Sequence, residues 1–142
     1  MPSNPVPQMK LYRDWLARER GLSFADYGAM WSWSVSDLEA FWRSIWDYHT
    51  LASPTPWARA LTKEQMPGAV WFEGAQMNYA QQVLRHVGPA HAAGQPAIIA
   101  ENEQGESREL SWPELRRQIA SLALTLRDLG VKRGERVVAY LP

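Results

Sequence analysis

The chain has 142 residues, and its hydrophobic content of 46% and charged content of 21% are typical of a folded globular protein rather than a disordered one. Its 15 basic and 15 acidic residues give a formal net charge of zero, so no basic excess indicates a nucleic acid or an anionic membrane as a partner. The absence of cysteine excludes disulfide scaffolds, thiolate zinc sites and cysteine nucleophiles within these residues.

Two helices are predicted in the first 35 residues. The first begins at Gln8, carries Tyr12 and Leu16 on one face, and ends at Gly21, a residue suited to a left-handed C-cap. Ser23 with Asp26 is a capping signal, and it predicts a short second helix over residues 24–33.

A third helix is predicted from Ser36 to about His49, and it concentrates more apolar side chains than any other segment. Ser36 and Glu39 have the spacing of a capping box. Apolar side chains then recur on one helical stripe, at Leu38, Phe41, Trp42, Ile45 and Trp46. Because large aromatics each bury roughly 150–250 Å², we expect the N-terminal half to assemble around this helix.

Residues 51–74 are predicted to form a strap without regular structure, because prolines and glycines interrupt a segment that still carries buried-type aromatics. A helix is expected after it, capped by Asn78 and Gln81 and ended by Gly88–Pro89. The small and polar residues 91–95 are a candidate domain boundary.

Beyond this boundary the pattern predicts a β-hairpin from residues 96–100 and 108–111, followed by a helix that a second capping box, Ser111 with Glu114, introduces. The apolar face of this helix is expected to be buried, and it consists of Leu115, Ile119, Leu122, Ala123, Leu126 and Leu129. A last strand is predicted over residues 136–141. A strand of this kind is covered on both faces, so we expect the chain to be the N-terminal piece of a longer protein.

No catalytic, cofactor-binding or metal-binding residue is predicted. The chain lacks a glycine-rich phosphate loop with its lysine. His86 and His91 lie close in sequence, but a metal site needs more ligands, so surface histidines are the favoured interpretation. Arg116 and Arg117 are interpreted as part of a solvated helix face rather than as a phosphate contact.

The serines and tryptophans between residues 31 and 46 are a further candidate site. Ser32, Ser34 and Ser36 have no His/Asp partners that would indicate a nucleophile, so caps and turns are favoured. Exposed in a row, the tryptophans would offer a stacking platform for sugars or bases. Their helical spacing favours packing in a core or between domains.

Three blocks of the sequence resemble the opening of acetoacetyl-CoA synthetases. The first comprises Tyr27, the run Trp31-Ser-Trp-Ser-Val35, Phe41-Trp42 and Trp46. The second is Trp71-Phe72-Glu-Gly74 followed by Asn78-Tyr79-Ala80 and Leu84-Arg85, and the third runs from Gly130 to Pro142. The second and third blocks also resemble the wider acyl-CoA synthetase group, whereas the Trp-Ser-Trp-Ser-Val run points to the acetoacetate enzymes.

The resemblance implies an adenylate-forming ligase. Such an enzyme joins acetoacetate to ATP as an acyl-adenylate with release of diphosphate, and then passes the acyl group to CoA with release of AMP. ATP, CoA and Mg²⁺ are thus expected for the full-length enzyme and none of them for these 142 residues alone. The family's catalytic motifs match no residue here, so the resemblance also assigns no site residue.

The resemblance further implies an α+β fragment. Residues 1–94 are expected to form a mostly helical, tryptophan-rich N-terminal extension. Residues 95–142 are expected to form the first hairpin, helix and strand of an α/β adenylate-forming domain. The fragment alone is expected to be inactive and to self-associate through its unfinished sheet.

Two alternatives remain open at the level of the sequence. One is a stand-alone protein-interaction module that uses the aromatic surface, and the other is a ligase for acetate or propionate. The first ten residues have no signal-peptide pattern and no segment approaches the roughly 18 apolar residues of a membrane span. We therefore expect a cytoplasmic protein with small-molecule substrates and with neither a nucleic-acid nor a membrane partner.

Overall fold

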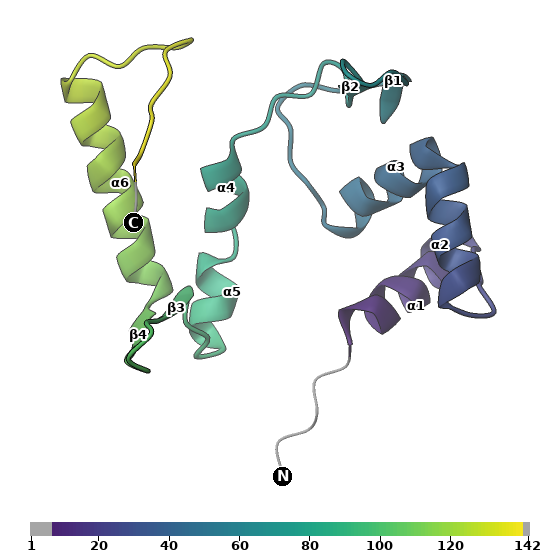
Figure 1. The fold of residues 1–142 in the computed structure, drawn as a ribbon, viewed down its shortest axis with the longest axis horizontal. Coiled ribbons are helices and arrows are strands. Elements are labelled where there is room, and N and C mark those ends of the chain that lie inside the picture. Colours follow the sequence, from purple (N-terminus) through teal and green to yellow (C-terminus); the bar gives the residue numbers. More distant parts are fainter. Residues whose placement is uncertain (1–6, 141–142) are drawn as a thin grey trace. The chain divides into compact units, whose positions relative to one another are not determined.

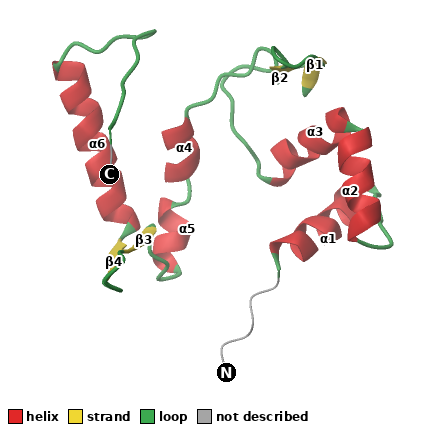
Figure 2. Cartoon of the chain, in the orientation of Figure 1, coloured by secondary structure: helices red, strands yellow, loops and turns green. Residues whose placement is uncertain are grey.

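The computed structural model describes residues 7–140 (Figure 1). Contacts within the chain group it into two compact units, Met1–Met77 and Asn78–Pro142, which are described separately below. Helices dominate both units, and each unit also has one small two-stranded sheet (Figure 2). The predicted mixture of a mostly helical N-terminal part and a later hairpin and helix is confirmed.

The first unit begins with three helices: α1 over Gln8–Arg20, α2 over Tyr27–Ser36 and α3 over Leu38–Tyr48. The prediction for α1 is confirmed at both ends. Gly21 adopts a left-handed φ of 65°, and the Leu22 N–H donates to the Leu16 carbonyl at 3.2 Å. Glycine suits this C-cap because it has no Cβ to clash at positive φ.

The predicted start of α2 is wrong by three residues. Asp26 is the N-cap, and its Oδ1 accepts a hydrogen bond from the Ala29 N–H at 2.8 Å. Ser23 lies outside the helix, so the helix begins at Tyr27. Both residue types are good N-caps, and the sequence pattern alone favoured the earlier one.

The predicted capping box of α3 is also wrong. Asp37 caps the helix instead, with its Oδ1 accepting from the Ala40 N–H at 3.0 Å. Ser36 belongs to the last turn of α2, where its Oγ donates to the Trp33 carbonyl at 3.3 Å. Glu39 is thereby available for partners outside its own helix.

The core of the first unit lies where α3 meets α1 and α2. Its buried cluster consists of Tyr12 and Leu16 of α1 and Met30 of α2. Of the predicted stripe on α3, Trp46 is buried and Leu38, Phe41 and Ile45 are half-buried, whereas Trp42 is 39% exposed. The prediction that this part assembles around α3 is confirmed, with Trp42 at the edge of the packed face.

A buried hydroxyl pair joins α1 to α3. Ser44 Oγ donates to the Phe41 carbonyl at 2.6 Å, so the Tyr12 hydroxyl is the donor in its 2.5 Å contact with Ser44 Oγ. Burial raises the pKa of Tyr12, and the hydrogen bond with Ser44 opposes that rise. The tyrosine is therefore neutral in the folded protein and acts as a hydrogen-bond donor.

Residues 51–74 are more regular than predicted. Strand β1, Leu61–Lys63, pairs antiparallel with β2, Val70–Trp71, in the register Leu61↔Trp71. The expectation of no regular element is therefore wrong, although the two strands are very short. The expectation of a strap with packed aromatics is confirmed, because Trp57 and Phe72 pack on Trp46.

The second unit starts with two short helices, α4 over Tyr79–Leu84 and α5 over Val87–Ala92. The Asn78 cap is confirmed, since its Oδ1 accepts from the Gln81 N–H at 3.1 Å. Gly88–Pro89 does not end a helix but lies in the first turn of α5. Proline is tolerated there because the first N–H groups of a helix have no intrahelical partner.

The predicted hairpin is confirmed as β3, Ile98–Glu101, paired with β4, Ser107–Leu110. Helix α6, Trp112–Asp128, follows it, and the Ser111 Oγ accepts from the Glu114 N–H at 3.4 Å. The predicted strand over residues 136–141 is wrong for the part that the structure describes, because residues 136–140 are irregular. Among the described residues no strand pairs with them, and a sheet requires such a neighbour for its hydrogen bonds.

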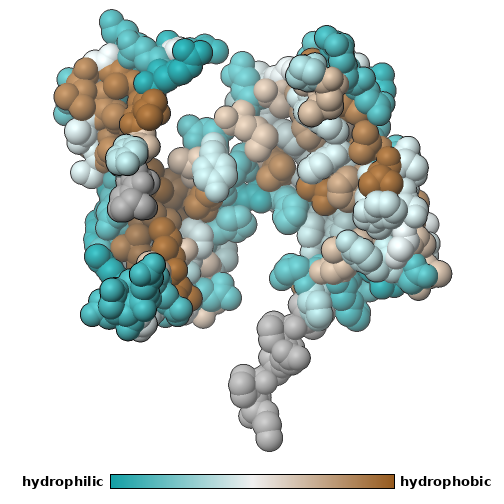
Figure 3. Space-filling model, in the orientation of Figure 1, coloured by the Kyte–Doolittle hydropathy of each residue, from teal (hydrophilic) through white to brown (hydrophobic). Residues whose placement is uncertain are grey.

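The two units differ in burial. All residues classed as buried belong to the first unit, and none of the described residues from 78 to 140 is buried. The predicted buried face of α6 is only partly covered, because Leu122 and Leu129 are exposed. Apolar residues accordingly appear on the surface over α6 (Figure 3).

We therefore predict that residues 1–77 fold alone and that residues 78–142 do not. The first unit has an apolar core, the main source of folding free energy, whereas the second has none among its described residues. Urea unfolding monitored by tryptophan fluorescence tests both fragments. A cooperative transition of residues 78–142, or its absence in residues 1–77, would contradict the prediction.

We also predict that Ser44→Ala destabilises the chain more than Tyr12→Phe. Ser44→Ala leaves the buried tyrosine donor without its acceptor, which costs about 1–3 kcal/mol. Tyr12→Phe removes the donor and leaves the bond from Ser44 to Phe41 intact, for about 1 kcal/mol. Denaturant midpoints measure both, and Tyr27→Phe, at an exposed hydroxyl, is the control with a change below about 0.5 kcal/mol.

Candidate functional site

The residues considered as candidates from the sequence are not brought together. Within residues 7–140 no group of three or more His, Cys, Asp or Glu side chains is placed to hold a metal ion. His86 Nε2 accepts from the Arg85 Nε at 3.3 Å, and His91 is exposed on α5. Arg116 and Arg117 are exposed on α6. None of the helices in this described range is long and apolar enough to span a bilayer.

Two of the candidate serines, Ser34 and Ser36, make hydrogen bonds within helix α2. Ser34 Oγ donates to the Trp31 carbonyl at 2.8 Å, and Ser36 Oγ donates to the Trp33 carbonyl. In both bonds the hydroxyl donates to a carbonyl three residues earlier in α2. Such bonds are local features of a helix and indicate no external ligand. A nucleophilic role for them has no support in this geometry.

The most organised polar feature of the first unit is a carboxylate clamp, which we define as Glu39 with the amides of Ala60 and Leu61. Glu39 lies in the first turn of α3. Its Oε1 accepts from the Ala60 N–H at 2.8 Å and its Oε2 from the Leu61 N–H at 2.7 Å. Arg59 Nε lies 4.0 Å from Oε2. The clamp fixes the chain before β1 to the start of α3.

The clamp changes the acidity of Glu39. Partial burial raises the pKa of the carboxyl, but the hydrogen bonds from Leu61 and Ala60, together with the charges of Arg59 and Arg43, lower it below its ordinary value. The side chain is therefore ionised at neutral pH. Both carboxylate oxygens already accept backbone hydrogen bonds, so the geometry suits a structural anchor better than a general base.

An open hollow of about 270 Å³ lies beside the clamp, between the end of α2, the start of α3 and β1. It is lined by Val35, Ser36, Asp37, Leu38, Glu39, Arg59, Leu61, Thr62 and Glu64. Two of its three acidic groups already have structural roles, Asp37 as a helix cap and Glu39 in the clamp. The hollow is a surface feature without a catalytic pair.

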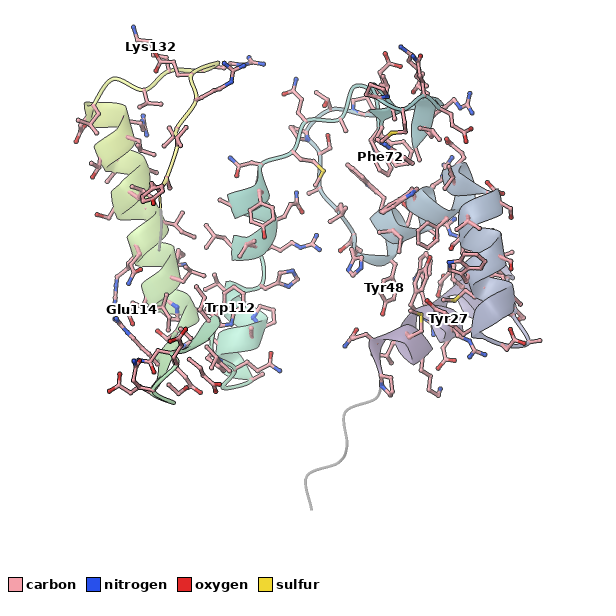
Figure 4. All side chains as sticks on the ribbon, in the orientation of Figure 1. Tyr27, Tyr48, Phe72, Trp112, Glu114 and Lys132 are labelled. Atoms are coloured by element: carbon pink, nitrogen blue, oxygen red, sulfur yellow. The ribbon has the colours of Figure 1, made fainter. Side chains whose placement is uncertain are left out.

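Three aromatic rings form a closed cluster next to the clamp. The ring centroids of Trp46, Trp57 and Phe72 lie 4.7–5.2 Å apart in all three pairings. The Arg43 guanidinium lies over Trp57 at 5.6 Å from its centroid. Figure 4 labels Phe72 above α3. This packing supports the core interpretation for these tryptophans.

A second aromatic series runs from Phe24 through Trp33, Phe41 and Trp42 to Trp71, with neighbouring centroids 5.2–5.7 Å apart. Its rings meet edge to face or tilted, the arrangements that aromatic pairs prefer. The series is a packing device, and it extends to the surface only at its last two members. This series does not form a platform of parallel exposed rings on which a sugar or a base could stack.

The clamp could not be predicted from the sequence, because the partners of Glu39 lie 21 and 22 positions away. The only local signal was a glutamate in the first turn of a helix, and the capping box explained it equally well. Because Asp37 and not Ser36 caps α3, the Glu39 carboxylate is not part of a capping box and binds the distant amides of Ala60 and Leu61.

Residues 27–83 match the family model described as acetyl-coenzyme A synthetase N-terminus. Over 94% of its length the chain is 34% identical to the acetoacetyl-coenzyme A synthetase of Rhizobium meliloti (strain 1021), and it covers 20% of that protein. It is 31% identical to the acetoacetyl-CoA synthetase of Xenopus tropicalis, over 99% of this chain and 21% of the relative.

Among solved structures, acetoacetyl-CoA synthetase from Streptomyces lividans matches with a TM-score of 0.79 and 41% sequence identity. The match covers 93% of this chain and 20% of that one. The chain thus spans about a fifth of the length of the relatives that it matches.

The chain is therefore homologous to the N-terminal region of acyl-CoA synthetases. Within that class it corresponds to the N-terminal part of acetoacetyl-CoA synthetases, as the three sequence blocks predicted.

We predict that Glu39→Gln destabilises the first unit by about 1–2 kcal/mol at pH 7, since a carboxamide has one acceptor oxygen for two buried amides and no charge. Chemical denaturation of the two proteins measures the difference. Glu64→Gln, an exposed residue of the same hollow, is the matched control and should change stability by less than about 0.5 kcal/mol.

The difference between wild type and Glu39→Gln should depend on pH. The folded-state pKa of Glu39 is lowered, so its stabilisation is complete above the ordinary value of 4.5 and is lost as the pH falls through the lower folded-state pKa. The difference should be constant from about pH 6 to pH 8 and shrink below about pH 4.5. A difference that grows on acidification would contradict the clamp.

Proposed function

We propose that this chain forms the N-terminal region of a ligase that activates acetoacetate with ATP and transfers it to CoA. The observation that carries the proposal is the similarity over nearly the whole chain, with 41% identity and a TM-score of 0.79, to a solved acetoacetyl-CoA synthetase. A site within the chain does not carry it, because the described residues contain no catalytic arrangement of their own.

The proposed reaction has two steps. The acetoacetate carboxylate attacks the α-phosphate of ATP, so that diphosphate leaves and an acyl-adenylate remains. The CoA thiol then attacks the acyl carbon, and AMP leaves. ATP, CoA and Mg²⁺ are the proposed cofactors and substrates of the whole enzyme, and the location that we propose for it is the cytoplasm.

Within that enzyme we assign this chain a scaffolding role. Residues 1–94 are proposed as the helical extension and residues 95–142 as the start of the adenylate-forming domain. The division into Met1–Met77 and Asn78–Pro142 reflects contacts inside this chain. It does not test where the adenylate-forming domain begins. The clamp and the aromatic cluster support the role, because both serve packing.

Acetate or propionate is the second candidate for the acid. The observation that favours it is the family description for residues 27–83, which names acetyl-coenzyme A synthetase. Acid specificity depends on a pocket that recognises the substrate, and we assign no residue of this chain to one. The relatives named acetoacetyl-CoA synthetase support acetoacetate as the first choice.

The experiment is an assay of the protein expressed from the reading frame that includes these 142 residues. We predict acetoacetate-dependent release of AMP and diphosphate in the presence of ATP, Mg²⁺ and CoA, with kcat/KM for acetoacetate at least about tenfold above that for acetate or propionate, equivalent to about 1.4 kcal/mol of discrimination. The 142-residue chain assayed alone should show no turnover.

Each other result has a definite meaning. A preference for acetate or propionate would replace the acid and keep the ligase. Turnover by the 142-residue chain alone would overturn the scaffolding role. A reading frame that ends at Pro142, together with a cooperatively folded monomer that captures a partner, would favour the stand-alone interaction module.

A further inference from the structure

Helix α2 presents an apolar stripe that is more than half exposed among the described residues. Tyr27, Trp31 and Val35 recur every four residues, so their side chains lie along one face of the helix. They are 59%, 55% and 52% exposed. Among the described residues, the rings of Tyr27 and Trp31 have no aromatic partner, unlike Trp33 on the inward side of the same helix.

The composition of α2 suits a surface that is buried permanently. The helix has no charged residue over Tyr27–Ser36. The centres of stable interfaces are depleted of charge and enriched in tyrosine and tryptophan. Val35 also lines the hollow beside the clamp, together with Leu38 and Leu61, so the stripe continues into a concave feature that a partner side chain can enter.

We infer that the α2 stripe is covered by the part of the synthetase chain that follows residue 142, and this inference rests on the longer ligase proposed above. The relatives are about five times longer than this chain, so most of their surface lies in that part. The three side chains expose roughly 300–400 Å², estimated from typical aromatic and aliphatic areas.

The small exposed area of the α2 stripe favours a partner within the same chain over a second copy of the protein. Stable association of separate molecules buries about 800 Å² on each partner, roughly twice what this stripe offers. A segment of the same chain needs less, because the covalent connection gives it a high effective concentration. The stripe therefore fits packing within one molecule.

The test uses the cysteine-free background of residues 1–142. Val35→Cys introduces a thiol of similar volume into the stripe, and Ala17→Cys introduces one on the exposed side of α1 as the control. A water-soluble maleimide labels each variant in the full-length protein and in the 142-residue chain. Mass spectrometry of the peptide that contains the introduced thiol gives the labelling rate.

We expect the Val35→Cys thiol to react at least about tenfold more slowly in the full-length protein than in the 142-residue chain. The Ala17→Cys thiol should react at similar rates in both. Circular dichroism and tryptophan emission matching the wild type show that the variants fold. A second variant in the stripe, Trp31→Ser, should lower the unfolding midpoint of the full-length protein and leave that of the 142-residue chain nearly unchanged.

Three outcomes overturn the inference: equal labelling rates in the two lengths, protection in the 142-residue chain that grows with protein concentration and so indicates a second copy, or a reading frame that ends at Pro142. Ligase activity is measured on the same full-length preparations. Activity with an unprotected thiol rejects only the inference, and protection without acetoacetate-dependent turnover rejects only the proposed function.

Discussion

The bonds from Glu39 to the amides of Ala60 and Leu61 determine how the first unit is assembled. Ala60 is completely buried, so its N–H would otherwise lack a partner. The two residues held by Glu39 also contact the next segment: Leu61 pairs with Trp71 across β1 and β2, and the Ala60 carbonyl accepts from the Phe72 N–H at 2.9 Å. Phe72 thereby reaches Trp46 of α3. One carboxylate thus positions a segment that a two-residue strand could not hold alone.

The hydroxyl pair and the clamp hold the middle and the first turn of the same helix. Ser44 lies in the middle of α3 and accepts from Tyr12, whereas Glu39 lies in its first turn. Buried polar groups in a small core are costly unless they are fully satisfied, and these are. They supply directional contacts that an aromatic core, which tolerates several packings, does not supply by itself. The second unit has no comparable polar contact to a buried group among its described residues.

Local signals in the sequence predicted the features that depend on neighbouring residues. Gly21, Asn78 and Ser111 were identified as caps because each interacts within a few residues of itself. The choice between Ser36 and Asp37 as the cap of α3 could not be predicted, since both types cap helices well and the decision depends on where α2 ends. The clamp depends on contacts across 21 and 22 positions and the β1–β2 pairing on contacts across seven to ten, which no capping pattern encodes. The sequence did predict an unfinished sheet, and what it missed is that residues 136–140 are irregular and do not form the expected strand.

The two helices that carry the candidate surfaces are directly coupled. Asp37 is both the C-cap of α2 and the N-cap of α3, so no flexible linker separates them. Glu39 follows two residues later, and Val35 precedes by two and lines the same hollow. A rotation of α2 therefore cannot occur without changing the start of α3, where the clamp is made. Fold similarity alone does not define an activity. The shared cap at Asp37 does connect the exposed face of α2 to the clamp on α3, and each residue of this connection can be substituted separately.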